Sequence, residues 1–219
     1  YRAAKGVIPM GMPGYNKQLR GYAYDPERAK ELLAEAGYPG GEGLKPLLLS
    51  FNSDEGHRAI AEAIAQQFNQ LGIDVQLQDM EWDYYKKQVN AMDLTLFRVG
   101  WHADYADADN FLFGMFHSSK VGISNYSAYN NPQVDKILDA ARAETKSNEE
   151  RLKLLQRAEE IIVDDAPMLW LFQKKAAALS GENVRHLEMD GLGMVDWFKA
   201  ELLKPSADGG GSSPSEEQV

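Results

Sequence analysis

The sequence predicts an α/β fold built around a mainly parallel sheet. Three short apolar segments, at 47–51, 73–78 and 94–99, have the length and residue types of β-strands. Segments with helical character, at 55–70 and 82–91, lie between them. A chain that alternates strands with helices places its strands parallel, because each helical crossover returns the chain to the same end of the sheet. Helices are therefore expected to flank the faces of the sheet.

The composition supports a folded protein and excludes several kinds of chemistry. Hydrophobic residues make up 44% of the 219 residues, enough for a globular core. The net charge of −10 argues against nucleic-acid binding, because phosphate contacts need clustered Lys and Arg. It is compatible with cationic or zwitterionic ligands, although an acidic surface is most often only an aid to solubility. The absence of cysteine excludes disulfides, thiolate catalysis and cysteine-ligated metals. The sequence contains no apolar run of about 18 residues, so it predicts no membrane-spanning helix.

The chain opens with a loop and a well-marked helix. Residues 1–24 are rich in Gly, Pro and Tyr without a sustained period, which favours an extended loop. The motif Asp25-Pro26-Glu27 is typical of a helix start, because Asp caps the first turn and Pro fits the first helical position. A helix is therefore expected over 27–36, ending at Gly37.

The elements of the sheet follow in order. Apolar residues predict the first strand at 47–51, and apolar residues at helical spacing predict a helix over roughly 55–70. Alternating apolar and polar residues at 73–78 predict a strand with one buried face. A short helix is expected at 82–91, ahead of the buried strand at 94–99.

The second half of the chain is predicted to be mainly helical. Residues 111–116 are expected to form a helix. Asn131 is placed to cap a helix over 133–142, and an apolar stripe predicts a longer helix over 149–163.

Towards the C-terminal end the pattern changes again. The apolar run at 168–172 predicts a strand, and residues 176–179 are expected to pair with it. Residues 192–203 form an apolar segment near the end of the folded part. The segment 205–219 is rich in Gly, Ser, Pro and acidic residues, so it is predicted to be disordered.

The most informative stretch is the loop at 100–112, directly after the strand at 94–99. It holds three carboxylates and two large aromatic side chains: Asp104, Asp107, Asp109, Trp101 and Tyr105. In open α/β sheets, ligands bind at such strand ends. Burying acids there is costly unless a cation neutralises them. The loop is therefore predicted to receive a positively charged group.

Five ordered motifs carry a family resemblance. They are Tyr24–Tyr38; Leu71-Gly72-Ile73-Asp74-Val75 with Glu81-Trp82; Gly100-Trp101 with Ala103-Asp104-Tyr105 and Asp109-Asn110-Phe111-Leu112; Asn125-Tyr126-Ser127 with Asn131-Pro132 and Val134-Asp135; and Glu150-Arg151 with Asp165-Ala166-Pro167. Over about residues 5–200, the chain resembles the C-terminal lobe of substrate-binding proteins of ABC importers, solute-binding family 5. That family captures peptides, nickel chelates and related solutes.

The resemblance implies a type II periplasmic-binding-protein lobe spanning residues 1–204, with the N-terminal lobe absent and 205–219 as a tail. Two such lobes close over a ligand by a hinge movement. The implied partners are a short peptide or similar solute, the missing lobe and a membrane permease. The implied location is periplasmic or at the cell surface. Because the last segments of the family run back to the other lobe, residues 181–203 are expected to bury less surface here.

The resemblance also implies a ligand role for Asp104. In peptide-binding members, the aspartate of this Trp-x-Ala-Asp motif is identified as the partner of the ligand's α-ammonium group. A carboxylate in a closed, water-poor cleft gains strongly from a cation. The alternative is that Asp104 caps the following turn or helix.

The other candidate ligand contacts are Trp101, Tyr105, Asn125, Arg98 and Asp107. Trp101 either stacks on the ligand or packs in the core, and Tyr105 is a weaker candidate for the same role. Asn125 either contacts a ligand's main chain or lies in a solvent-facing loop. Arg98 either meets a ligand carboxylate or pairs with a local acid. Asp107 either tunes Asp104 or binds a cation.

Neither catalysis nor a metal or cofactor site is predicted. The four histidines lack metal-ligand spacing and are favoured as solvated side chains: His57, His102, His117 and His186. Asp104 and Asp107 imitate the paired carboxylates of glycosidases, but no nucleophile motif or cofactor loop accompanies them. Two alternatives to peptide capture stay open. One is a lone lobe that docks onto another protein, and the other is a relative that binds sugars or metal chelates.

Overall fold

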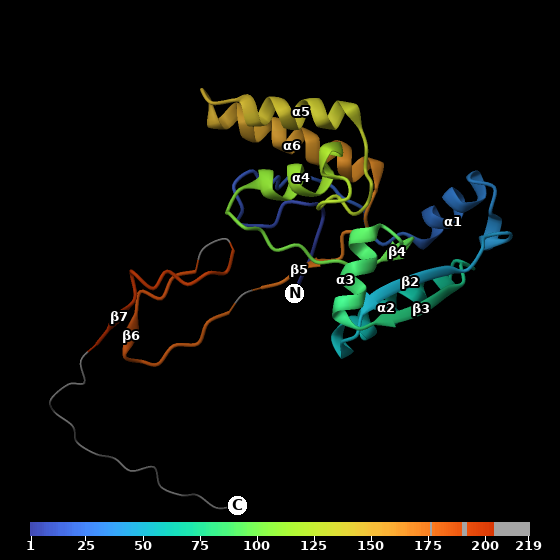
Figure 1. Cartoon of the computed structure of the whole chain (residues 1–219), viewed down its shortest axis with the longest axis horizontal. Helices are drawn as coiled ribbons and strands as arrows, with labels where there is room; N and C mark the ends of the chain where they lie inside the picture. Colours follow the sequence, from blue (N-terminus) through green and yellow to red (C-terminus); the bar gives the residue numbers. More distant parts are fainter. Residues whose placement is uncertain (176, 190–191, 204–219) are drawn as a thin grey trace, which may run out of the picture.

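The computed structural model describes residues 1–175, 177–189 and 192–203. Figure 1 shows a sheet with its helices, a second group of helices beside it, and a C-terminal arm that extends away from both. The predicted tail at 205–219 lies outside the described residues.

The sheet confirms the predicted parallel arrangement. Strand β2 (Leu47–Asn52) is central, with β3 (Val75–Met80) on one side and β4 (Leu96–Phe97) on the other, and both neighbours run parallel to it. Helix α2 (Glu55–Asn69) connects β2 to β3, and α3 (Trp82–Ala91) connects β3 to β4. The strand predicted at 94–99 is shorter than expected.

The sheet has its own hydrophobic core. Buried residues of β2 and β3 pack against the buried Ala61 and Ala65 of α2. These small side chains let the helix approach the sheet closely, while the predicted apolar residues Ile64 and Phe68 cover the edge of the contact. The turn into β3 requires glycine at position 72, because its φ is +83° and a Cβ there would overlap the carbonyl oxygen of Gly40.

Helix α1 (Pro26–Glu35) begins as predicted, but it packs loosely. The side chain of Asp25 accepts a hydrogen bond from the Arg28 N–H at 3.0 Å, so the predicted cap is present. No residue of this helix is buried, and Leu32 on its apolar side is 48% exposed. A 3-10 turn, η1 (Pro39–Gly41), leads from here to β2.

The second core lies among three helices, which are α4 (Ala108–Phe116), α5 (Pro132–Ala143) and α6 (Asn148–Asp165). Their N-caps are Asp107, Asn131 and Ser147. A 3-10 turn, η2 (Ser118–Lys120), follows α4. Helices α5 and α6 lie side by side, and α4 packs beneath them (Figure 1). The large side chains of these three helices that have no exposed surface are Leu112, Phe116, Val134, Leu138, Leu155 and Ile162.

The N-terminal segment is more than a loop. Val7, Ile8 and Met12 are buried in the same core as the three helices. The Ile8 N–H donates to Oε1 of the fully buried Glu159 on α6 at 2.8 Å. The segment also forms β1 (Arg2–Ala3). This burial was not predicted, because these apolar residues follow no helical or strand period.

The predicted partner of the strand at 168–172 is wrong. Of the predicted strand, only residue 172 lies in a strand, which is β5 (Phe172–Gln173), and β5 pairs antiparallel with β1 from the other end of the chain. Residues 177–179 form no strand, and residue 176 lies outside the described part. Apolar content indicated a buried strand here, but it carried no information on which strand supplies the hydrogen bonds.

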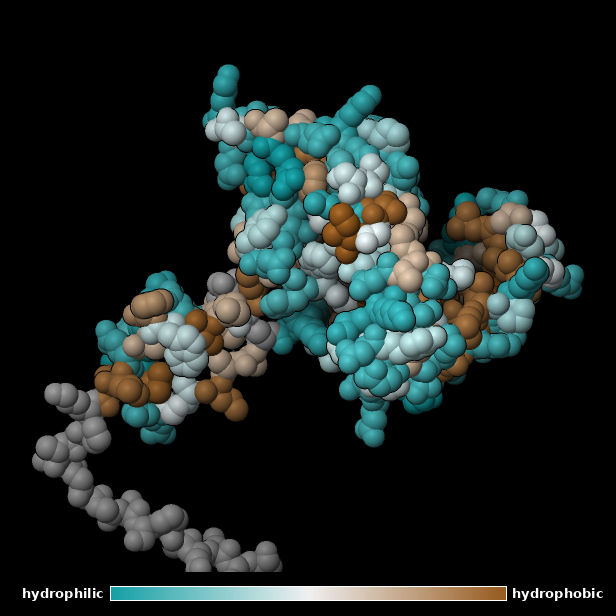
Figure 2. Space-filling model, in the orientation of Figure 1, coloured by the Kyte–Doolittle hydropathy of each residue, from teal (hydrophilic) through white to brown (hydrophobic). Residues whose placement is uncertain are grey.

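The C-terminal arm contains a small antiparallel pair, β6 (Val184–Arg185) with β7 (Glu201–Leu202). Trp197 is 72% exposed and the side chain of Phe198 is fully exposed. Figure 2 shows brown, apolar side chains on the surface of this arm. This exposure agrees with the expectation for 181–203, while the comparison with a two-lobed protein stays a prediction. Within the described residues, none of the helices is both long and apolar enough to cross a bilayer.

Candidate ligand-binding site

The loop between β4 and α4 lies at the carboxyl end of the parallel sheet, where the sequence placed the site. Asp104, in the middle of this loop, is exposed. Within the described part of the chain, its carboxylate accepts no hydrogen bond and forms no ion pair. The alternative that Asp104 caps the next helix is wrong, because the N-cap of α4 is Asp107. The carboxylate of Asp104 therefore has no partner among the described residues.

Asp107, in contrast, is fully engaged by the protein. Its Oδ1 accepts the Asp109 N–H at 2.8 Å as the helix cap. The Arg151 guanidinium, reaching over from α6, donates to both carboxylate oxygens at 2.9 and 2.8 Å. Burial alone would raise the pKa of Asp107, but these hydrogen bonds and the charge of Arg151 outweigh it and lower the pKa. The geometry favours a role in shaping the loop over direct ligand contact.

Tyr105 and Asp109 form a second contact with the helices. The Tyr105 hydroxyl donates to Asp109 Oδ2 at 2.9 Å, and Arg142 Nε lies 3.2 Å from Asp109 Oδ1. The Arg142 guanidinium also lies 3.8 Å from the centre of the Phe113 ring. Burial and the neighbouring Asp109 raise the pKa of Tyr105. The ring of Tyr105 is half-exposed, so its predicted contact with a ligand stays open.

Trp101 packs on α4. Its indole Nε1–H donates to Asn110 Oδ1 at 2.9 Å, and its ring lies against Gly114, where a Cβ would meet it at 3.5 Å. The ring is partly buried against the helical core. Of the two roles predicted for Trp101, this geometry favours packing in the core.

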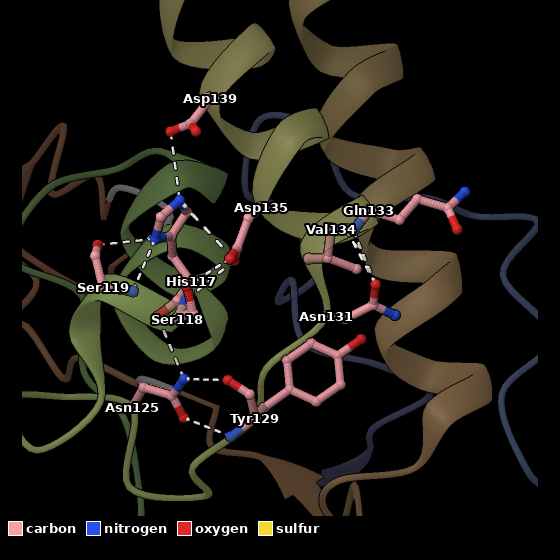
Figure 3. Close-up of polar contacts among 10 residues, drawn as sticks. All are labelled: His117, Ser118, Ser119, Asn125, Tyr129, Asn131, Gln133, Val134, Asp135 and Asp139. Carbon is pink, nitrogen blue, oxygen red and sulfur yellow. Dashed lines mark hydrogen bonds and ion pairs between the residues drawn. The ribbon is translucent and has the colours of Figure 1, made fainter.

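Asn125 is part of the scaffold. Its side chain is fully buried, so the predicted solvent-facing loop is wrong. Its amide Nδ2 donates to the carbonyls of Tyr129 at 2.8 Å and His117 at 3.3 Å, and Oδ1 accepts the Tyr129 N–H at 3.2 Å (Figure 3). These contacts hold the segment between η2 and α5 closed. They leave Asn125 few polar atoms for a ligand. The contact of Asn125 with a ligand's main chain stays a prediction.

The side chain of Arg98 is a cation at the carboxyl end of the sheet. Its N–H donates to the Ser50 carbonyl at 3.0 Å, which fixes its backbone beside β2. Its guanidinium lies 5.9 Å from the centre of the Phe172 ring, and its Nε is buried without a hydrogen-bond partner. Burial lowers the pKa of Arg98. Among the described residues it forms no ion pair, so the predicted pairing with a local acid is wrong.

His57 is a residue that sequence reasoning missed. It lies in the first turn of α2, a few residues after the carboxyl end of β2, and its Nδ1 is buried without a hydrogen-bond partner. Burial, followed by the charge of Arg98, lowers the pKa of His57. The two side chains are thus electrostatic neighbours. Its position just past a parallel strand is the signal in the sequence that could have identified it.

Among the described residues, no three His, Cys, Asp or Glu side chains are grouped closely enough to hold a metal ion. The carboxylates of the loop are instead bound to arginine side chains or, in the case of Asp104, left free. The site thus contains an anion, the Asp104 carboxylate in the loop, and a cation, the Arg98 guanidinium, close to His57 at the start of α2.

Comparison with known families identifies the chain. The model of the bacterial extracellular solute-binding proteins, family 5 Middle, matches residues 1–123, which is more than half of the chain. The chain belongs to this family. Its members are solute-binding proteins rather than enzymes, and they act in the periplasm or outside the cell.

Two curated relatives of this family illustrate the similarity. The chain is 36% identical to heme-binding protein A of Haemophilus influenzae over 171 residues, 76% of this chain and 31% of the relative. It is 31% identical to the oligopeptide-binding protein OppA of Bacillus subtilis over 208 residues, 92% of this chain and 37% of the relative. The chain therefore spans about a third of the length of the curated relatives it matches.

Solved structures of the family place the fold. The periplasmic binding protein DppA of Helicobacter pylori, in complex with the peptide STSA, matches 93% of this chain and 39% of its own with a TM-score of 0.75 and 28% identity. OppA of Haemophilus influenzae, in complex with RPPGFSPFR, matches 93% of this chain and 40% of its own with a TM-score of 0.74 and 26% identity. The chain has the type II periplasmic-binding-protein fold, as predicted.

Proposed function

We propose that this chain is one lobe of a two-lobed extracytoplasmic protein that captures short peptides and presents them to the permease of an ABC importer. The B. subtilis relative is named an oligopeptide-binding protein, and the H. pylori structure holds a peptide. The partial coverage of both supports a second lobe, which the ligand would also contact. The protein works by capture, without catalysis.

The observation that carries the proposal is the free carboxylate of Asp104. The neighbouring acids Asp107 and Asp109 are neutralised by arginine side chains, which leaves Asp104 as the acid of this loop that lacks a protein cation. The amino group of a peptide supplies that cation once the cleft closes and water leaves. Asp104 therefore binds the α-ammonium group of the ligand.

The cation at the other side of the site supports a zwitterionic ligand. Arg98 has a buried Nε with no hydrogen-bond partner, and His57 beside it has a buried Nδ1 in the same condition. A peptide carboxylate would satisfy both polar groups and remove the cost of leaving them unpaired. Arg98 binds the carboxyl end of short peptides, and His57 assists it.

The test is calorimetry of peptide binding to the two-lobe protein, because affinity in a closing cleft comes from desolvation of the ligand on both sides. Asp104→Ala is expected to weaken binding by about 2–5 kcal/mol, since the buried ammonium group loses its partner. Asp93→Ala is the matched control, because Asp93 is an exposed acid that precedes the opposite end of β4. Equal affinities for the Asp104 variant and the parent would remove Asp104 from the site.

Mass spectrometry of the molecules that co-purify with the two-lobe protein separates the ligand classes. Peptides on the parent and none on Asp104→Ala support the proposal. A metal chelate on both would favour the function in the name of the H. influenzae relative instead. Self-association through the exposed Trp197 and Phe198, with no small ligand, would favour a protein-docking lobe.

A further inference from the structure

The loop that carries Asp104 is held to the helices on both sides. Before Asp104, the indole of Trp101 donates to Asn110 on α4. After it, Asp107 caps α4 and binds Arg151 of α6. The free carboxylate thus lies in a short span between two fixed points.

The span between Asp104 and the second fixed point is itself folded. The Asp107 N–H donates to the Tyr105 carbonyl at 2.9 Å, which closes a tight turn directly after Asp104. The Tyr105 hydroxyl is tied to Asp109, whose other oxygen lies 3.2 Å from Arg142 Nε. A movement of Asp107 is therefore transmitted to Asp104 through a few backbone bonds that have little freedom of their own.

The Arg151–Asp107 pair has the geometry of a fixed clamp. Each guanidinium terminal nitrogen donates to a different carboxylate oxygen, at 2.9 and 2.8 Å, and the side chains are only 20% and 27% exposed. Such a two-point fork fixes orientation as well as distance. The Arg157–Glu160 pair on the same helix has one contact at 3.1 Å between side chains 61% and 42% exposed, and pairs of that kind contribute little.

We infer that Arg151 is a positioning residue for ligand binding, which acts through Asp107 to hold the Asp104 carboxylate where the ligand's ammonium group arrives. This rests on the proposed function of Asp104. Arg151 does not contact the ligand. Its contribution is to fix the loop before binding. The free energy of ligand binding then does not have to offset the entropic cost of ordering the loop. Arg142 supports the same loop through Asp109.

The test uses Asp107→Asn, which keeps a good helix-capping side chain but loses the charged pair with Arg151. Affinity is measured on the two-lobe protein for a peptide with a free amino terminus and for the same peptide N-acetylated. Asp107→Asn is expected to lower the affinity for the free peptide about tenfold, as for a lost interaction between charged groups. The affinity for the acetylated peptide is expected to stay unchanged. In the Asp104→Ala background, Asp107→Asn should change neither affinity further.

Two more variants keep the test independent of folding. Arg151→Lys retains one charged contact and the cap, and should give an intermediate preference for the free peptide. Arg157→Gln removes a charge from the same helix and should leave the preference unchanged. Hydrogen exchange of the amides at 101–107, measured on this chain, should be faster in Asp107→Asn than in the parent.

The outcomes separate the two proposals. If Asp104→Ala abolishes the preference for the free peptide but Asp107→Asn leaves it intact or weakens both peptides equally, the positioning role is refuted and the role of Asp104 stands. If Asp104→Ala leaves the preference unchanged, both proposals fail.

Discussion

Glu159 makes the stability of the protein depend on pH in an unusual direction. Its side chain is 1% exposed on α6; Oε1 accepts the Ile8 N–H, while Oε2 has no hydrogen-bond partner. Burial raises the pKa of Glu159 from 4.5 to about 7, and the hydrogen bonds from the N-terminal segment offset only part of that rise. The folded protein therefore prefers the protonated carboxyl group.

The sign and size follow from linkage. Because the folded pKa lies above the unfolded one, the contribution of Glu159 is fully favourable below pH 4.5 and is lost as the pH rises through about 7. The difference between these two pKa values corresponds to about 3 kcal/mol. This loss opposes the usual gain from carboxylates such as Asp107, whose pKa is lowered in the fold.

The assay is urea unfolding between pH 4.5 and 8 for the parent and Glu159→Gln. The variant keeps an oxygen that accepts the Ile8 N–H, but it cannot ionise. The free energy of unfolding of the parent should fall relative to the variant by about 3 kcal/mol across this range. Glu62→Gln, at an exposed position on α2, is the control and should track the parent. A constant difference between parent and Glu159→Gln would refute the reasoning.

Two further predictions concern the scaffold. Gly72→Ala should lower the free energy of unfolding by about 1–3 kcal/mol, because φ is +83° and the new Cβ meets the Gly40 carbonyl. Gly37→Ala, with φ of +90° and open space around it, should lower the free energy of unfolding by less. Thermal unfolding of both variants and the parent measures the difference. Asn125→Ala should cost about 1–3 kcal/mol and speed proteolysis between η2 and α5, because it removes the hydrogen bonds that the buried amide makes to the Tyr129 carbonyl and N–H. Unchanged proteolysis would contradict that role.

Local signals predicted most of the fold. The cap at Asp25 and the cap at Asn131 are present, and the helix at 82–91 has the bounds that the sequence indicated. Each of these features depends on residues within a few positions of one another, so a single sequence carries them. The parallel sheet follows from the order of strands and helices alone.

Pairings between distant parts of the chain were not predictable in the same way. The partner of β5 is β1, which lies at the other end of the sequence. The charge of Arg98, which follows β4, likewise acts on His57 of α2, about forty residues earlier in the chain. The position of the site loop at the end of the sheet was predicted correctly. The pairing of Asp107 with Arg151 and of Asp109 with Arg142 was not, because it depends on how α5 and α6 pack against the loop.

The β1–β5 ribbon has a mechanical consequence. The chain enters the folded body and leaves it through two antiparallel strands of two residues each, side by side (Figure 1). A ribbon with two residues in each strand bends and twists at little cost, because few backbone hydrogen bonds must distort. Any domain attached on the far side of this ribbon can therefore swing as a unit while the interior of the three helices keeps its packing undisturbed.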